Sequence, residues 1–237
     1  MAQGPLDTLI HLALSTRQEK FAKQVGSALR FIPEIGPLSG FAEKSETLAS
    51  LKDAMGEGEV MGFFFDSRPD LPEGFIATVE GPLVQLVYDK EKAQPVHDGK
   101  TAPPEEEASN DIVALGGKDA QEMLELAGIA RPGPFTLRTH ELGSFYGLRV
   151  NGKLAAMAGE RLRIPGHTEI SAVCTHPDHL GKGYATLLMS RVMQGILERG
   201  ETPFLHSRAD NDRALAVYKR LGFVPRVYGH FMGVCRG

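Results

Sequence analysis

The sequence predicts an α/β fold, and two observations carry that prediction. In the second half of the chain, short strand-like runs alternate with stretches whose apolar residues recur at helical spacing. Within that half, an apolar strand-like run at 170–174 leads into a turn with glycine at 181 and 183, and an apolar helical pattern follows at about 183–199. A strand, a glycine turn and a helix in this order are typical of domains in which helices cover a sheet.

Composition narrows the class of protein. The chain has 237 residues, a formal net charge of −4, 42% hydrophobic residues and 24% charged residues, which are ordinary values for a globular protein. There is no basic run, so we expect no nucleic-acid partner and no membrane partner. The first twenty residues lack the pattern of a signal peptide, and no apolar stretch approaches about 18 residues. Cys174 and Cys235 are too few and too far apart for a disulfide framework, so we expect a cytoplasmic protein.

The first half is predicted to form its own α/β domain over residues 1–88. Its helices are expected within 1–30 and 45–55, and its strands at 60–65, 75–79 and 83–88, with Gly81-Pro82 as the turn between the last two. Residues 89–110 are rich in proline and glutamate and are interpreted as a linker or long surface loop, with an acidic docking segment as the alternative.

Residues 111–237 are predicted to form the second domain. The expected elements are a strand at 112–115, a helix ending at Gly128, a hairpin around Asn151-Gly152, a strand at 168–175, the helix at 183–199, a strand at 204–207, a helix at 211–221 and two final strands at 223–227 and 229–234.

The glycine turn has a chemical interpretation as well as a structural one. The first N–H groups of a helix lack intrahelical partners, and glycine lets an anion approach them closely. By itself this pattern fits an anion site and a ligand-free tight turn equally well. A nucleotide P-loop is excluded, because the chain has no Gly-Lys-Ser/Thr at the required spacing.

Two motifs together make residues 111–237 similar to the GNAT superfamily of acyl-coenzyme A-dependent N-acyltransferases. The first is EISAVCTHPDHLGKGYATLL at 169–188; the second consists of Asn211, Ala214, Tyr218, Gly222 and Phe223. The resemblance implies the GNAT fold, a mixed and mostly antiparallel sheet with flanking helices. It also implies transfer of an acetyl group from acetyl-CoA to a primary amine of a small molecule, amino acid or peptide, by direct attack in a ternary complex without a metal. We expect a monomer or homodimer.

The same resemblance assigns the residues that bind acetyl-CoA. Backbone groups of the strand would face the pantetheine arm, and the strand ending near Ser207 would splay away to admit it. Backbone N–H groups of the turn would bind the pyrophosphate. The family's Arg/Gln at the start of the turn is Leu180 here, so we expect weakened binding, and a catalytically silent CoA-binding regulatory module stays open as the alternative. The cofactor-binding candidates are Val173, Cys174, Thr175, Gly181, Lys182, Gly183, Tyr184, Ala185, Thr186 and Asn211.

Two residues are catalytic candidates. By resemblance, Tyr218 would protonate the departing coenzyme A sulfur; the alternative is a core-packing tyrosine. Glu169 lies where histone-acetylating relatives carry their catalytic base; the alternative is an exposed strand carboxylate. A base matters because deprotonating a lysine-like amine at pH 7 costs roughly 4.6 kcal/mol, whereas an α-amine costs roughly 1.4 kcal/mol. Glu160 is the second candidate for the base, although an ion pair is the favoured interpretation.

Other reactive side chains receive structural interpretations. His176 and His179 are expected to be solvated turn residues rather than metal ligands, and Cys174 a buried thiol rather than a nucleophile. The acceptor is expected between the 129–140 loop and a 226–231 hairpin, with Phe135, Arg138 and Tyr228 as lining candidates. The first half is interpreted as a degenerate second copy of the fold that covers the acceptor site or supports a dimer.

Overall fold

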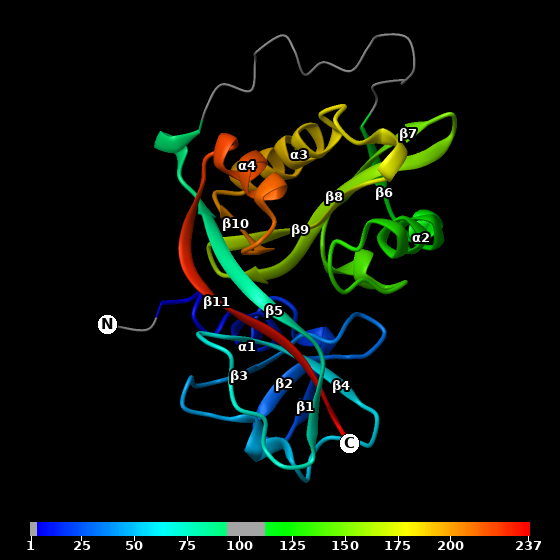
Figure 1. Cartoon of the computed structure of the whole chain (residues 1–237). Coiled ribbons are helices and arrows are strands. Elements are labelled where there is room, and N and C mark those ends of the chain that lie inside the picture. Colours follow the sequence, from blue (N-terminus) through cyan, green and yellow to red (C-terminus); the bar gives the residue numbers. More distant parts are fainter. Residues whose placement is uncertain (1–3, 94–111) are drawn as a thin grey trace.

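A computed structural model describes residues 4–93 and 112–237 of the chain. Its main feature is an eight-stranded sheet in the order β4-β11-β5-β10-β9-β8-β7-β6, next to a three-stranded sheet in the order β1-β2-β3 (Figure 1). The strands are β1 (Ala22–Val25), β2 (Ala28–Phe31), β3 (Ser39–Phe41), β4 (Val60–Phe65), β5 (Phe75–Tyr88), β6 (Val113–Leu115), β7 (Phe145–Val150), β8 (Lys153–Ile164), β9 (His167–Thr175), β10 (Thr202–Arg208) and β11 (Phe223–Arg236); the α-helices are α1 (Leu9–Leu14), α2 (Ala120–Ala130), α3 (Tyr184–Glu198) and α4 (Asp212–Arg220).

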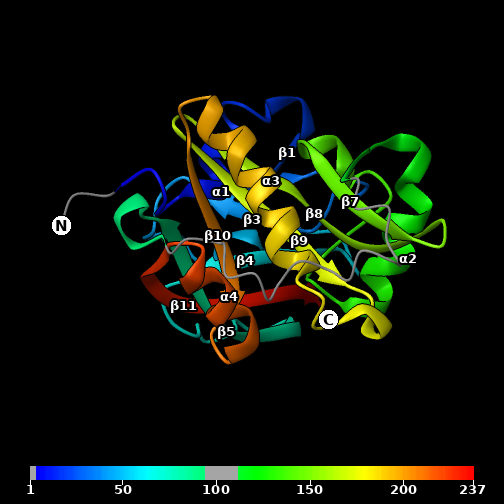
Figure 2. The same cartoon turned by 90° about the horizontal axis from the view of Figure 1, so that it is seen from above.

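The large sheet is mixed but mostly antiparallel. β9 and β10 are parallel, and every other neighbouring pair in that sheet is antiparallel. Helices α3 and α4 pack on one face of the sheet, whereas α1 and α2 pack on the opposite face (Figure 2). The predicted α/β class and the mixed sheet with flanking helices are therefore confirmed.

Two pairs of expected strands are single long strands. β5 runs through Gly81-Pro82, and β11 runs through the segment expected to be a hairpin at 226–231. The two strands pair with each other along most of their lengths, with register shifts between Pro225 and Val227 and between Gly233 and Val234. Pro82 is tolerated because β10 ends beside it, and its carbonyl accepts a hydrogen bond from the Ala209 N–H.

The first helix prediction is mostly wrong. Only residues 9–14 form an α-helix, and residues 22–31 form the β1–β2 hairpin instead. The hairpin turns at Gly26-Ser27, where Gly26 has φ +55°. The helix expected at 45–55 is a short 3-10 helix, Leu48–Leu51.

The two predicted domains contribute strands to the same sheet. β4 and β5 come from the first half of the chain, yet both pair with β11, and β5 also pairs with β10 (Figure 1). A separately folding domain at 1–88 therefore stays a prediction, as does its origin as a degenerate copy. The interpretation of 89–110 as a linker falls largely outside the described residues.

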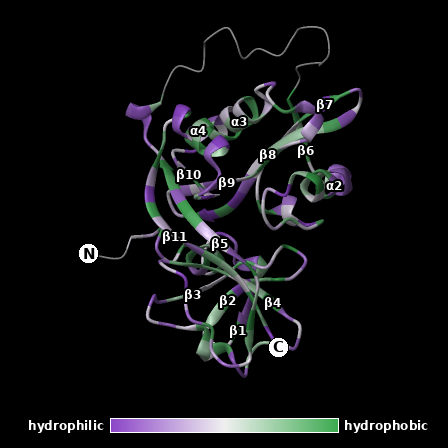
Figure 3. Ribbon diagram, in the orientation of Figure 1, coloured by the Kyte–Doolittle hydropathy of each residue, from purple (hydrophilic) through white to green (hydrophobic). Residues whose placement is uncertain are grey.

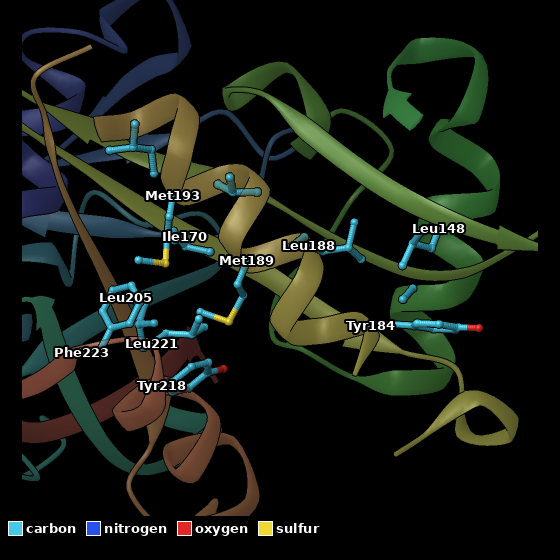
Figure 4. Close-up of a cluster of buried hydrophobic side chains, with 14 of the residues drawn as sticks. Leu148, Ile170, Tyr184, Leu188, Met189, Met193, Leu205, Tyr218, Leu221 and Phe223 are labelled. Atoms are coloured by element: carbon cyan, nitrogen blue, oxygen red, sulfur yellow. The ribbon is translucent and has the colours of Figure 1, made fainter. Parts of the chain in front are cut away.

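Apolar side chains fill the spaces on both faces of the large sheet. The outer turns of α2 are hydrophilic, whereas its sheet-facing side is hydrophobic (Figure 3). The largest cluster lies under α3 and α4, and includes Leu188, Met189 and Met193 of α3 against Ile170 and Leu205 of the sheet (Figure 4). Met189 and Met193 are thus core residues, as expected.

Candidate active site

The site is organised by the separation of two parallel strands. The ladder between β9 and β10 covers only three residue pairs, from His167–Thr202 to Glu169–Phe204. β9 then continues to Thr175, while β10 continues to Arg208 paired with β5 on its other side. This matches the predicted splay of the strand that ends near Ser207, and it opens a gap between two strands in the middle of the sheet.

A β-bulge lies on β9 beside this gap. Met157 and Gly159 of β8 pair with Cys174 and Ser171 of β9, so β9 contains one extra residue there. Ala172 takes a left-handed conformation with φ +52°, which costs a residue with a side chain about 1 kcal/mol or more. The bulge turns backbone groups of β9 out of the regular ladder, at the place where the sequence predicts backbone contacts to a ligand.

The glycine turn leads from β9 into α3, as predicted. Gly181 and Gly183 have φ of +82° and +78°, values that side chains resist. A Cβ on Gly181 would meet no atom within 4 Å, so the space in front of the turn is open. Gly183 is the N-cap of the fifteen-residue α3 and supplies no side-chain cap. The first N–H groups of α3 thus lie next to an open turn and have no side-chain cap, an arrangement that suits an anion.

Several predicted cofactor-binding residues can contribute only backbone groups. Tyr184 is the first residue of α3, and its ring is buried in the core (Figure 4). Burial also raises the pKa of the Cys174 thiol to about 12, so Cys174 is a buried thiol rather than an activated nucleophile. Leu180 is 47% exposed beside the turn.

The second motif lies on α4. Asn211 is the N-cap of α4, and its side-chain oxygen accepts the Ala214 N–H at 3.2 Å. Tyr218 lies two turns further on, with its ring packed edge-on against Phe223 at a centroid distance of 6.4 Å (Figure 4). Burial raises the pKa of the Tyr218 phenol to about 12, so the hydroxyl carries its proton at neutral pH.

Glu169 is fully buried rather than exposed. Arg161 donates two hydrogen bonds to its carboxylate, from Nε at 2.8 Å and from Nη2 at 2.7 Å. His206 Nδ1 lies 2.7 Å from the same carboxylate. Burial alone would raise the pKa of Glu169, but Arg161 and His206 outweigh it and hold the pKa at about 2. A carboxylate that is so weakly basic, and that already accepts at both oxygens, is poorly suited to take a proton from an amine.

Sequence reasoning missed His206 and the polar chain behind it. His206 Nε2 lies 3.1 Å from the Gln85 side-chain amide, Arg226 donates to Gln85 Oε1 at 2.8 Å, and Asp7 accepts from Arg226 at 2.7 Å. The available signal was a histidine on β10 two residues after the fully buried Phe204, because alternate residues of a strand face the same side.

This series of hydrogen-bonded side chains lies along a cavity of about 380 Å³, a size typical of small-ligand sites. The cavity lies on the side of the sheet that faces α1 and combines residues of both halves of the chain. Its lining includes Asp7, Ser39–Phe41, Glu43, Lys44, Glu46, Phe63–Ser67, Asp70, Gln85, His206 and Arg226–Gly229.

The predicted acceptor residues are only partly brought together. Tyr228 lines the cavity and is 63% exposed. Phe135 instead packs edge-on against Phe145, and Arg138 forms a surface ion pair with Glu141. The expected hairpin at 226–231 is wrong, since these residues belong to the single strand β11. The 129–140 loop does not line this cavity, and the position of the acceptor stays a prediction.

The remaining candidates have structural partners. Glu160 is buried and pairs with Arg199 at 2.8 Å, rather than with Arg161 or Arg163. His176 Nδ1 accepts the Asp178 N–H at 3.3 Å in the turn before the glycines. Across residues 4–93 and 112–237, no three His, Cys, Asp or Glu side chains gather as a metal site would require. None of the helices in those ranges has the length and hydropathy of a membrane span.

Known proteins with similar sequences and structures identify the class. Residues 145–229 match the family model of FR47-like proteins. N-alpha-acetyltransferase RimI of Mycobacterium tuberculosis is 32% identical over 123 residues, which are 47% of this chain and 77% of that protein. A GNAT-family protein from Novosphingobium aromaticivorans is 33% identical with a TM-score of 0.85, and the match covers 99% of this chain and 100% of that one.

These matches define an acyltransferase of the acyl-CoA-dependent type. The chain belongs to the GNAT superfamily of N-acyltransferases. A GCN5-related N-acetyltransferase from Kribbella flavida, 17% identical, covers 96% of this chain with a TM-score of 0.54 and shows the same fold over both halves.

Proposed function

We propose that this enzyme transfers an acetyl group from acetyl-CoA to a primary amine of a small molecule, amino acid or peptide, by direct attack in a ternary complex. Membership of the GNAT superfamily supports acetyl-CoA as the donor. The relative RimI is named as an N-alpha-acetyltransferase, which supports an amine as the acceptor.

The observation that carries the proposal is that β9 and β10 separate after three residue pairs, with the glycine turn on one face of the sheet and the cavity on the other. The glycine turn and the start of α3 lie on the face covered by α3 and α4, whereas the cavity lies on the face of α1. Leu205 packs under α3, and the next residue, His206, lines the cavity. Two substrates approaching from opposite faces can therefore meet in the gap.

The residues on the first face fit acetyl-CoA. The open turn at Gly181 and the uncapped start of α3 suit its pyrophosphate, with backbone N–H groups as the binding atoms. The edge of β9 at Val173, Cys174 and Thr175, which β10 leaves free of strand pairing, suits its extended pantetheine arm.

Two groups would act on the reaction itself. A backbone N–H of β9 next to the Ala172 bulge would stabilise the negative charge that develops on the thioester oxygen. The Tyr218 hydroxyl, which carries its proton at neutral pH, would give a proton to the departing sulfur. Direct attack is favoured over an acyl-enzyme because the Cys174 thiol is buried and its pKa is raised to about 12.

Coenzyme A release from acetyl-CoA tests this function. The acceptors would be amino acids, polyamines, short peptides and aminoglycosides, with a reaction lacking acceptor as the control. We expect acceptor-dependent release, and a fall of about 10²-fold or more in kcat for Tyr218→Phe with acetyl-CoA affinity retained. Tyr146→Phe is the matched control, because Tyr146 also packs against the main core but contacts Arg191 instead.

The alternative is a catalytically silent CoA-binding regulatory module, which Leu180 at the start of the turn favours. Acetyl-CoA binding by calorimetry without turnover of any acceptor, and with Tyr218→Phe indistinguishable from the wild type, would support that alternative.

A further inference from the structure

We propose that the cavity on the α1 face binds the acceptor amine in its cationic form, and that His206 rather than Glu169 takes its proton. The proposal rests on the proposed acetyl transfer and makes Glu169 a positioning residue, which acts through His206.

The hydrogen bonds around His206 fix the orientation of its ring and the nitrogen that carries the proton. Its Nδ1 is 2.7 Å from Glu169 Oε1, and Glu169 is locked in turn by the two hydrogen bonds from Arg161. Because an ionised carboxylate can only accept, Nδ1 carries the proton and donates it to this hydrogen bond. Glu169 is 0% exposed and does not line the cavity, whereas His206 does line it, with a side chain that is 4% exposed.

The opposite nitrogen, Nε2, is kept as a proton acceptor. Arg226 can only donate, so the Gln85 side chain must turn its oxygen toward Arg226, where the distance is 2.8 Å. The Gln85 amide nitrogen then points at His206 Nε2 and donates to it at 3.1 Å. Gln85 thereby occupies the position that a donor N–H of the acceptor would take, and it also lines the cavity.

Aromatic packing holds the ring in place. Phe64 stacks on the His206 ring at a centroid distance of 4.3 Å, and Phe204 meets it edge-on at 5.9 Å. The imidazole thus has one fixed plane, one proton on Nδ1, and one lone pair on Nε2 that accepts from Gln85, so an acceptor ammonium must displace the Gln85 N–H before Nε2 takes its proton. This combination is what a general base requires, and the same support from a carboxylate stabilises the imidazolium once it forms.

The charge of the cavity lining selects the class of acceptor. Its carboxylates are Asp7, Glu43, Glu46, Asp66 and Asp70. Against them stand two permanent cations, Lys44 and Arg226, and both are paired within the lining: Lys44 with Asp66 at 2.9 Å and Arg226 with Asp7 at 2.7 Å. The lining therefore carries excess negative charge, which attracts an ammonium and favours acceptors with more than one positive charge.

The proposed step balances as follows. His206 Nε2 takes one proton from the ammonium, and the freed lone pair of the nitrogen forms the C–N bond to the thioester carbonyl carbon. The C–S bond breaks, and its electron pair leaves on sulfur. The Tyr218 hydroxyl gives that sulfur a proton and is restored by the excess proton on the new amide nitrogen. The products are the amide, the free thiol and one proton held by His206.

The pH dependence of this step depends on the charges around His206. Glu169 on β9 faces Nδ1, with Arg161 of β8 behind it; on the other side, Arg226 of β11 acts through Gln85 of β5, with Asp7 behind Arg226. The neutral ring of Phe64 on β4 covers one face.

His206→Asn is the decisive variant, because an asparagine amide can still donate to Glu169 but has no basic nitrogen. With L-alaninamide or spermidine as the acceptor, we expect kcat/KM at pH 7 to fall about 10²-fold or more. The loss should shrink steadily as the pH rises toward the pKa of the acceptor's own amine, since the amine then loses its proton to water. A loss that is the same at every pH would overturn the proposal, as would full activity.

His230→Asn is the matched control. His230 also bonds a glutamate, with Nε2 2.9 Å from Glu80, but it lies outside the cavity lining. We expect its pH profile to follow the wild type. Acetyl-CoA affinity, measured by calorimetry, should be equal in all three proteins. If no acceptor turns over with the wild-type enzyme, the proposed function fails; if the wild type and His206→Asn turn over alike, only the role of His206 fails.

A second measurement needs no turnover. In ¹⁵N spectra of histidine-labelled protein without substrate, His206 should show a protonated Nδ1 and an unprotonated Nε2. The Nε2 signal should shift when spermidine is added. A proton on Nε2 with a bare Nδ1, in the same spectrum, would overturn the proposal because the lone pair would then face Glu169.

Discussion

The proposed donor and acceptor sides of the separated strands β9 and β10 are built from different parts of the protein. On the donor side, the glycine turn, the start of α3 and the bulged edge of β9 present backbone groups, and they come from one continuous segment at 170–186. On the acceptor side, the cavity is lined by side chains from segments spread between Leu6 and Gly229. Under the proposed function, the donor would be bound mainly by backbone groups, whereas acceptor choice would depend on side chains that can change one at a time.

This difference predicts that a substitution on the acceptor side leaves acetyl-CoA affinity unchanged, and that a substitution on the donor side leaves acceptor binding unchanged. The largest effect is expected from Arg161→Met on the acceptor side, which leaves the Glu169 carboxylate buried without its main partner. We expect a loss of about 3–5 kcal/mol in the free energy of unfolding, measured by urea denaturation. Arg138→Met removes an exposed ion pair instead and should cost at most about 1 kcal/mol. Acetyl-CoA affinity of the folded protein should change in neither variant; a loss in Arg161→Met alone would break the comparison.

The pH dependence of stability should also show the effect of the buried Glu169 carboxylate. The pKa of Glu169 is lowered from 4.5 to about 2 in the folded protein. Its contribution to stability is therefore complete above pH 4.5 and is lost as the pH falls toward 2. We expect wild-type stability to drop by about 2 kcal/mol more between pH 6 and pH 3 than that of Glu169→Gln, in urea titrations at the two pH values. Equal slopes for the two proteins would contradict the depressed pKa.

The donor side can be tested with a matched pair of glycines. Gly181 and Gly152 have φ of +82° and +79°, and neither would bring a Cβ within 4 Å of another atom. Alanine at either position should therefore cost a similar 1 kcal/mol or so of stability. Only Gly181→Ala should weaken acetyl-CoA binding, by about tenfold in calorimetry. Equal affinities in the two variants would show that the turn at Gly181 does not hold the ligand.

The smallest expected effect concerns the charge of the cavity. Glu43→Gln with Glu46→Gln should raise KM for spermidine about threefold, and the difference should fade at high salt because exposed charges are screened. Asp53→Asn with Glu57→Gln removes the same charge from exposed positions outside the cavity and should leave KM unchanged. An increase that salt does not reduce would point to lost contacts rather than to attraction at a distance.

The strand, turn and helix of the proposed donor side were predictable because their sequence signals are local. A strand, a glycine turn and a helix within about thirty residues read directly from spacing, and Tyr218 with Asn211 follows from a motif on one helix. The acceptor side was not predictable in this way. The partners of His206 lie at Glu169, Gln85 and Phe64, and no spacing rule links them.

Of the errors in the fold, one passed over a local signal and the other depended on pairing between distant residues. Phe21, Val25 and Ala28 also fit a helical period, and the Gly26-Ser27 turn that sets the hairpin was the stronger local signal. Gly81-Pro82 normally interrupts a strand, but here pairing with β11 keeps β5 continuous. Arg161 reaches the buried Glu169 from the next strand, a contact that the sequence pattern alone did not indicate.

The place of β11 between β4 and β5 has a consequence for how the protein is made. β4 and β5 leave the ribosome early, yet the strand that pairs with both comes from residues 223–236, more than 130 residues later. Until those residues have been synthesised, the edges of β4 and β5 that β11 later covers stay unpaired and can associate with other chains. A nascent chain of this enzyme should thus depend on chaperones late in translation, and folding should be slow for its size because its key pairings are so distant in sequence.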